Sequence, residues 1–291
     1  MATPPELLLW LAVPVGLLVG VACGVVGYSA WPLVVPLTFV VGGHGLYESI
    51  LTSVLVDLLN SALLAVTSAR RGDVDVKEAS RLGGLSVVGV LAGAAVAFVL
   101  LDRFTDLFRG GVGYVNLLLG AFFVHRGLRE RKREAAATSP APGDPAADGG
   151  RGDSMLSRWR DSMSPEQRRQ ATLAFCTVNA FLVGVIGFGG GFNVVLFLVV
   201  LLGIPPLRAV GTAMLYAVVV LSALAVAYLA FLRFTLPTWP LVLAFGAFSA
   251  VGLLLGTSFA KRLPEWGLYA LIGVVVVVTG IAATFQALIV G

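Results

Sequence analysis

Charged residues are scarce in this sequence: only 12% of its 291 residues are Asp, Glu, Lys or Arg, while 58% are hydrophobic. Soluble domains carry about 25% charged residues, so this composition excludes an ordinary soluble enzyme or binding domain. Uncharged runs longer than about 18 residues recur along the chain, as expected for helices that span a bilayer. We therefore predict an all-α, multi-pass protein of the cytoplasmic (inner) membrane.

Residues that often carry catalysis or bind metals are also few. His44 and His125 are the only histidines, and each lies at the end of an apolar run, so a histidine-based metal site or catalytic triad is not expected. Cys23 and Cys176 lie inside apolar runs, where a thiol behaves as a small hydrophobic group. No glycine-rich loop ends in Lys-Ser or Lys-Thr, the signature of many nucleotide hydrolases. We predict no enzymatic activity, no cofactor and no metal.

The few basic residues lie mainly in loops between the apolar runs, so the net charge of +4 does not indicate a nucleic-acid partner. Membrane proteins concentrate Lys and Arg in their cytoplasmic loops. On this rule we predict that the loop at 70–81 and the linker at 127–169 face the cytoplasm. Lys261 and Arg262 indicate a further cytoplasmic loop.

Four apolar runs precede the linker and four follow it, which indicates an internal duplication. When the sequence is compared with itself at an offset of 160 positions, equivalent residues coincide without gaps. We therefore predict a first transmembrane repeat at 1–126, a linker at 127–169 that is basic and then rich in Ala, Pro and Gly, and a second transmembrane repeat at 170–291. The coinciding residues are Gly24, Gly27, Val34, Val35, Gly43 and Thr52 in the first repeat and Gly184, Gly187, Val194, Val195, Gly203 and Thr212 in the second.

The first apolar run of each repeat, at 7–47 and 170–207, is too long for one crossing, because about 20 helical residues span the hydrocarbon core. Both runs contain Gly or Pro near the middle, at 27–32 and 187–191. We predict that each is a broken, re-entrant helix with an unwound turn at membrane depth and a short return helix. If both runs return to the side on which they start, the repeats are inverted and both termini lie outside. If both cross fully, the repeats are parallel; we favour the inverted arrangement.

Unwound backbone inside a membrane is tolerated only where protein or a wet cavity satisfies it, and free N–H groups at the start of a helix attract anions. The two turns, with return helices expected near 33–41 and 192–202, form our candidate substrate site. Hydroxyls one turn into the next run would add donors, unless they bond back to their own helix. The alternative is that the glycines only allow close helix packing. The candidate residues are Gly27, Tyr28, Ser29, Ala30 and Trp31; Gly187, Phe188, Gly189, Gly190, Gly191, Phe192 and Asn193; and Thr52, Ser53 and Thr212.

Asp57 is the only acidic residue in the middle of an apolar run, and its equivalent in the second repeat is Ala217. An ionisable group inside a membrane usually faces a cavity or a partner, which makes Asp57 a candidate carrier of protons or another cation coupled to transport. The alternative is a polar contact, shared with Asn60 on the same helical face, that packs two helices. Glu48 and Arg208 stand at equivalent positions near the membrane surface, where Arg208 is the better candidate for attracting an anion.

Several short motifs recur in the two repeats. The second repeat contains Gly187-Phe188-Gly189-Gly190-Gly191-Phe192, Gly203-Ile204-Pro205 and Ala209-Val210-Gly211-Thr212, and the first contains Gly24-Val25-Val26-Gly27 and Thr52-Ser53. With these motifs the chain resembles the TauE/SafE family of sulfite exporters over nearly its whole length except the linker. The resemblance implies export of a small sulfur-containing anion such as sulfite or an organosulfonate. Such transport would be driven by a gradient through alternating access.

The two turns differ in composition, because Tyr28 to Trp31 stand where the second repeat has Phe188 and three glycines. A close approach of backbone to an anion is therefore expected only in the second turn, and the more aromatic cavity would favour an organosulfonate over sulfite. Two other functions remain open: transport of a neutral solute or a cation with Asp57 as the main ligand, and a membrane subunit without transport. The expected partners are a small anion, the lipid bilayer and protons; an oligomer is compatible with the sequence.

Overall fold

A computed structural model describes residues 5–100, 162–187, 191–200, 202–232 and 238–259, and single helical residues between 117 and 132 and between 266 and 281. No strand occurs among these residues, and six of the helices are long and apolar enough to cross a membrane. The prediction of an all-helical, multi-pass membrane protein is confirmed. The elements are α1 (Pro5–Val26), α2 (Trp31–Val35), which continues as the π-helix η1 (Pro36–Val41), α3 (Leu46–Arg70), α4 (Val76–Leu100), α7 (Pro165–Ile186), α8 (Phe192–Val200), α9 (Pro206–Phe231) and α10 (Trp239–Phe259).

The first helices of the two halves coincide in position at an offset of 160 residues. Helix α7 begins and ends 160 positions after α1, and α9 begins 160 positions after α3. The glycines that precede and follow the short helices also agree, with φ of 70° at Gly27 and 75° at Gly187, and 67° at both Gly43 and Gly203. Only glycine adopts this left-handed conformation without strain. Helices α1 and α7 therefore stop at equivalent glycines, Gly27 and Gly187.

Local sequence also fixes where α7 begins. The side-chain oxygen of Ser164 accepts a hydrogen bond from the backbone N–H of Gln167, and the side chain of Gln167 accepts one from the N–H of Ser164. This reciprocal pair satisfies two N–H groups that the first turn of a helix leaves unpaired. Pro165, at the first helical position, has no N–H to satisfy. The membrane segment after the linker is thus anchored at its first turn.

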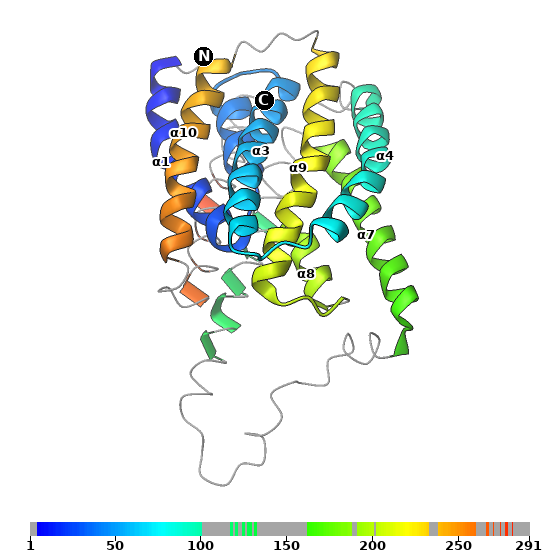
Figure 1. Cartoon of the computed structure of the whole chain (residues 1–291). Helices are drawn as coiled ribbons and strands as arrows, with labels where there is room; N and C mark the ends of the chain where they lie inside the picture. Colours follow the sequence, from blue (N-terminus) through cyan, green and yellow to red (C-terminus); the bar gives the residue numbers. More distant parts are fainter. Residues whose placement is uncertain are drawn as a thin grey trace, which may run out of the picture.

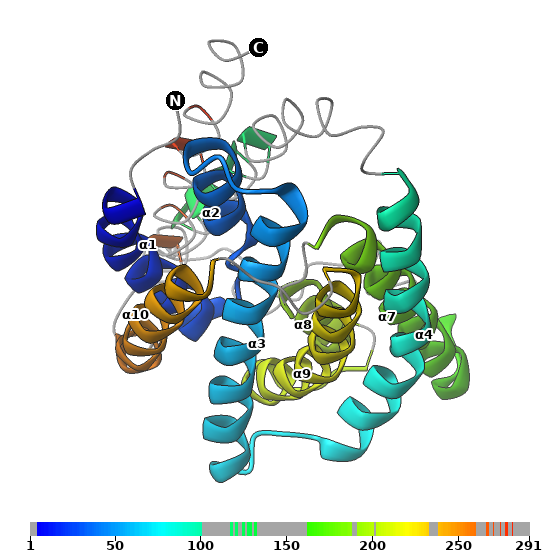
Figure 2. The same cartoon turned by 90° about the horizontal axis from the view of Figure 1, so that it is seen from above.

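Helices from different halves of the chain pack against each other. Helix α1 lies along α10, and α4 lies along α7, with α3 and α9 between these two pairs (Figure 1, Figure 2). In Figure 1, α1 and α3 both begin at the upper end of the molecule, whereas α7 and α9 both begin at the lower end. The connection from α3 to α4 and the last residues of α10 also lie at the lower end, which we call the linker end because α7 begins there.

The fourth apolar run expected in each half lies largely outside the described residues. The residues that are described between 117 and 132 and between 266 and 281 are helical. A Cβ at Gly127 would lie 2.8 Å from both the backbone oxygen of Trp266 and the backbone nitrogen of Ala270. The guanidinium of Arg131 lies 5.1 Å from the centre of the Trp266 ring, within the range of a cation–π contact. These two segments therefore pack against each other.

Glycines bring the backbones of α4 and α7 close together. A Cβ at Gly93 would overlap the backbone oxygen of Phe181 and lie 3.0 Å from the Cα of Gly184. Gly84, on the same helix, has open space where its Cβ would be. We expect Gly93→Val to lower the midpoint of thermal denaturation in detergent, because the two helices must separate, and Gly84→Val to lower it much less. If both variants lower the midpoint equally, the change in helix propensity explains the result and the contact between α4 and α7 does not.

Candidate functional site

The first break, between α1 and α2, is buried from Gly27 to Trp31. The side chains of Tyr28, Ser29, Ala30 and Trp31 are all at most 3% exposed. The N–H of Gly27 still bonds to the carbonyl oxygen of Cys23 at 2.8 Å and so closes the last turn of α1. The residues after Gly27 leave the helix, and their polar backbone groups need other partners at this depth.

Asp57, on α3, supplies partners for this break. The hydroxyl of Ser29 donates a hydrogen bond to its Oδ2 at 2.5 Å, and the N–H of Ala30 donates to its Oδ1 at 2.6 Å. The N–H of Trp31 in turn donates to Ser29 Oγ at 3.2 Å. Asp57 is only 3% exposed, and none of the described Lys, Arg or His residues lies within ion-pair distance of it. The carboxylate thus accepts hydrogen bonds at the start of α2 from a neighbouring helix.

Asp57 also marks the depth of the break. Asp57 lies roughly 17 Å along α3 from Leu46 and roughly 20 Å from Arg70, at a rise of 1.5 Å per residue. It is therefore near the middle of a helix that spans the membrane. Asn60, one turn further on, makes a separate contact, because its Oδ1 accepts a hydrogen bond from Ser249 of α10 at 2.7 Å. Asn60 therefore makes a polar contact between α3 and α10, and Asp57 makes one between α3 and the first break.

The second break follows Gly187, which ends α7 in the left-handed conformation. Phe188, Gly189 and Gly190 lie outside the described residues, as does the side chain of Phe192. Gly191 is buried directly before α8, and a Cβ there would overlap the methyl group of Met214 on α9. A Cβ at Gly187 would overlap Ile50 of α3. The described ends of this break are therefore closely packed against α3 and α9.

The two breaks meet in the middle of the molecule. The indole N–H of Trp31, at the first break, donates a hydrogen bond to the carbonyl oxygen of Ile186, the last residue of α7, at 2.9 Å. The methyl group of Met214 lies against both breaks. A Cβ at Gly27 would lie 2.7 Å from this methyl group, and a Cβ at Gly191 would overlap it. The structure thus brings together the described parts of the two turns, which lie about 160 residues apart in the sequence.

The three candidate hydroxyls have different surroundings. Thr52 donates to the carbonyl oxygen of Glu48 at 2.7 Å, as in the alternative of bonding back to its own helix, and its oxygen lies 3.0 Å from that of Thr238. Thr212 accepts a hydrogen bond from the N–H of Asp75 at 2.9 Å and so holds the α3–α4 connection to α9. Ser53 is fully buried, and its hydroxyl has no hydrogen-bond partner among the described residues.

A group of polar side chains in the second half was missed in the sequence analysis, except for Asn193. The side-chain N–H of Asn193 on α8 donates to the side-chain oxygen of Asn179 on α7 at 3.3 Å. Tyr216 on α9 is 3% exposed, and its hydroxyl donates to the backbone oxygen of Cys176 at 2.9 Å. The signal was present in the sequence, because the first half has Val19, Leu33 and Val56 at the equivalents of Asn179, Asn193 and Tyr216.

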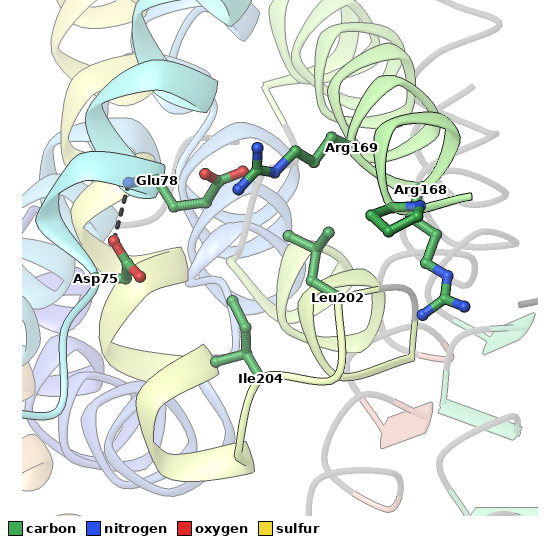
Figure 3. Close-up of a pocket in the computed structure, with 7 residues that line it drawn as sticks. Asp75, Glu78, Arg168, Arg169, Leu202 and Ile204 are labelled. Carbon is green, nitrogen blue, oxygen red and sulfur yellow. Dashed lines mark hydrogen bonds between the residues drawn. The ribbon is translucent and has the colours of Figure 1, made fainter. Parts of the chain in front are cut away.

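A pocket of about 260 Å³ opens at the linker end, between the first turns of α4 and α7 and the α8–α9 connection (Figure 3). Nearby, the guanidinium of Arg208 lies 3.3 Å from the carboxylate of Asp75. Arg208 is about half exposed, as expected for a residue near the membrane surface. The pocket therefore combines charges of both signs at one end of the helices. Its main lining residues are Asp75, Glu78, Arg168, Arg169, Leu202 and Ile204.

Comparison with known proteins identifies the family. Searches of curated proteins and of solved structures found no match to the chain. The family model described as "Sulfite exporter TauE/SafE" matches residues 8–283, which cover both halves of the chain. Its match agrees with the six described helices that are long and apolar enough to cross a membrane. The chain therefore belongs to the TauE/SafE sulfite exporter family.

Proposed function

We propose that this protein exports sulfite or an organosulfonate across the inner membrane by a gradient-driven, alternating-access mechanism. The observation that carries this proposal is the meeting of the two breaks at Trp31 and Ile186. Helix α8 begins at Phe192, six residues after Ile186 in the chain, and the start of a helix attracts negative charge. Discontinuous helices that meet near the middle of a membrane form the substrate sites of many secondary transporters. The anion is bound between the two turns, close to Gly189–Gly191.

The two halves are inverted repeats with re-entrant first runs. Three observations support this arrangement: the common offset of 160 positions, the equivalent left-handed glycines and the opposite starting ends of α1 and α7 in Figure 1. The starts of α1 and α3 at one end favour a return of the intervening segment to the side from which it came. The same argument applies to α7 and α9 from the other end.

The arrangement predicts which loops share a side of the membrane. In a variant without Cys23 and Cys176, single cysteines would replace Glu6, Lys77 or Arg262. A membrane-impermeant thiol reagent applied to intact cells is expected to label position 6 and to spare positions 77 and 262, because α3 and α10 both end at the linker end. Labelling of both position 77 and position 262 from outside would contradict the inverted arrangement.

Asp57 couples transport to protons in this mechanism. Its carboxylate is the only buried acidic side chain among the described residues, and it lies at the first break near the middle of α3. A change in its protonation would alter the hydrogen bonds that it accepts from Ser29 and Ala30 and so the geometry of the break. Both hydrogen bonds join α3 to the start of α2.

The proposed function is tested by flux into proteoliposomes that contain the purified protein. Sulfite, sulfoacetate, thiosulfate and sulfate are offered separately, with protein-free liposomes as the control. We expect saturable flux of sulfite or sulfoacetate, and competition between these two anions gives the preference. Flux of a neutral solute or cation without any anion flux would support the first alternative, and no flux of any solute would support a subunit without transport.

A further inference from the structure

We propose that Ser86, Asn179, Asn193 and Tyr216, which we call the polar cluster, form the side-chain part of the anion site. The transported anion binds there by accepting hydrogen bonds from the amides of Asn179 and Asn193 and from the hydroxyl of Ser86, with no charged side chain in contact. The Tyr216 hydroxyl, which donates to Cys176, positions the cluster. This inference rests on the proposed function, because it assigns ligands within the same site. It places most of the side-chain recognition in the second half of the protein.

The polar cluster joins four helices that surround the start of α8. Ser86 is on α4, Asn179 on α7, Asn193 on α8 and Tyr216 on α9. The amide of Asn193 reaches the amide of Asn179 at 3.3 Å, a long hydrogen bond. The hydroxyl of Tyr216 bonds to the carbonyl oxygen of Cys176 and also lies beside the side chains of Ser86 and Asn179. Polar side chains from four helices therefore lie in one region.

Ser86 provides an independent indication of a ligand. Its hydroxyl is fully buried, and it makes no hydrogen bond of standard geometry to any described residue, although it faces Tyr216. A buried polar group without a partner costs about 1–3 kcal/mol. Native proteins rarely keep such a group without a ligand, a water molecule or a functional reason. The oxygen atoms of a bound anion would accept the hydrogen bond that the protein leaves unmade.

The first half shows that the fold does not need polar groups at these positions. The equivalents of Asn179, Asn193 and Tyr216 are Val19, Leu33 and Val56, which belong to one apolar cluster and are at most 3% exposed. Ser86 likewise has Gly246 as its equivalent. Burying polar groups in place of apolar ones is unfavourable unless they gain partners. Polar residues inside membrane proteins accordingly tend to be functional.

The position of Asn193 connects the polar cluster with the second break. Asn193 lies in the first turn of α8, two residues after the buried Gly191. An anion at the start of α8 is therefore within reach of its amide. Sulfite and sulfonates each carry three oxygen atoms on sulfur, and these oxygens accept hydrogen bonds from several directions. Neutral donors from different helices suit such an anion, because they surround it without fixing it as strongly as an arginine would.

The pocket at the linker end and the polar cluster share helix α7. Along α7, Asn179 lies eleven residues after Arg168, or roughly 17 Å further along the helix. In Figure 3, the side chains of Arg169 and Glu78 extend into the region between α7 and α4 above Leu202. Arg168 and Arg169 place positive charge at this pocket, together with the acidic Asp75 and Glu78. In this proposal the anion passes from the pocket along α7 to the polar cluster.

The test measures the concentration of sulfite that gives half-maximal flux in proteoliposomes. Ser86→Ala is the sharpest variant, because it removes a hydroxyl that makes no hydrogen bond of standard geometry to any described residue. Asn179→Val and Asn193→Leu install the residues of the first half, and Tyr216→Phe removes only a hydroxyl. We expect the half-saturating concentration to rise at least threefold in Ser86→Ala and at least tenfold in the double variant of Asn179 and Asn193.

Thr38→Val is the matched control, because it removes a buried hydroxyl that bonds only within its own helix, to Val34 and Val35. Its half-saturating concentration should equal that of the wild type. If the wild type transports neither sulfite nor sulfoacetate, the proposed function fails and this inference fails with it. If the wild type transports sulfite and Ser86→Ala and Tyr216→Phe, as folded proteins, keep its half-saturating concentration, the inference alone is overturned.

Discussion

Replacing Asp57 by alanine is expected to abolish transport and to reduce the stability of the protein by about 3 kcal/mol. The carboxylate accepts hydrogen bonds from the Ser29 hydroxyl and the Ala30 N–H, and both donors would lose this partner inside the membrane. Each buried donor without a partner costs about 1–3 kcal/mol. The start of α2 would also lose its connection to α3. Thermal denaturation in detergent and sulfite flux in proteoliposomes measure the two effects.

Asp57→Asn separates the structural role of this residue from its charge. Asparagine has nearly the same size and retains one oxygen that can accept from Ala30, so the loss of stability should be much smaller than in Asp57→Ala. Because an amide does not ionise, flux should no longer respond to a pH gradient. If flux in Asp57→Asn responds as in the wild type, Asp57 does not carry the coupling proton. If Asp57→Ala is as stable as the wild type, the hydrogen bonds to the first break contribute little.

The positions of the breaks were predictable from sequence, because their causes are local. Run length and the glycines at Gly27 and Gly187 required each long helix to stop, and both glycines have positive φ in the structure. A short helix was expected near 33–41, and α2 and η1 occupy Trp31–Val41. The π-helical form of η1 was not predicted, because no sequence pattern distinguishes one more residue per turn in an apolar segment.

The partners of the site residues were not predictable, because they come from distant parts of the chain. The sequence identified Asp57 as an unusual acid, but its partners Ser29 and Ala30 lie more than 25 residues away, in the break between α1 and α2. Likewise, Asn179 and Tyr216 are each single polar residues in apolar runs, and only the packing of α7, α8 and α9 brings them near Asn193. Comparing the halves for differences, as well as for identities, would have revealed these positions.

The two halves differ in whether a carboxylate lies opposite the break. In the first half, the Asp57 carboxylate accepts the N–H of Ala30. The equivalents in the second half are Ala217 and Gly190, so α9 offers no carboxylate at the matching position. Ala217 is buried on α9, as Asp57 is on α3. At the first break, the protein itself provides a negative charge, the Asp57 carboxylate. At the second break, the transported anion would provide it.

Replacing Gly190 by valine is therefore expected to weaken sulfite binding more than tenfold, equivalent to more than about 1.4 kcal/mol. A Cβ at this position obstructs the approach of an anion to the backbone and restricts the turn conformations that glycine allows. The dissociation constant is measured by sulfite-induced thermal stabilisation of the purified protein and compared with the half-saturating concentration for flux.

Ser29→Val, in the first turn, is the comparison variant. It removes the hydrogen bond to Asp57 and should lower stability, but it should change the dissociation constant for sulfite less than Gly190→Val does, because the first turn is already occupied by the carboxylate. The second turn, which lacks such a carboxylate, should carry most of the backbone contribution to affinity. If Gly190→Val folds, reaches the membrane and binds sulfite as tightly as the wild type, these glycines serve helix packing alone and the anion binds elsewhere.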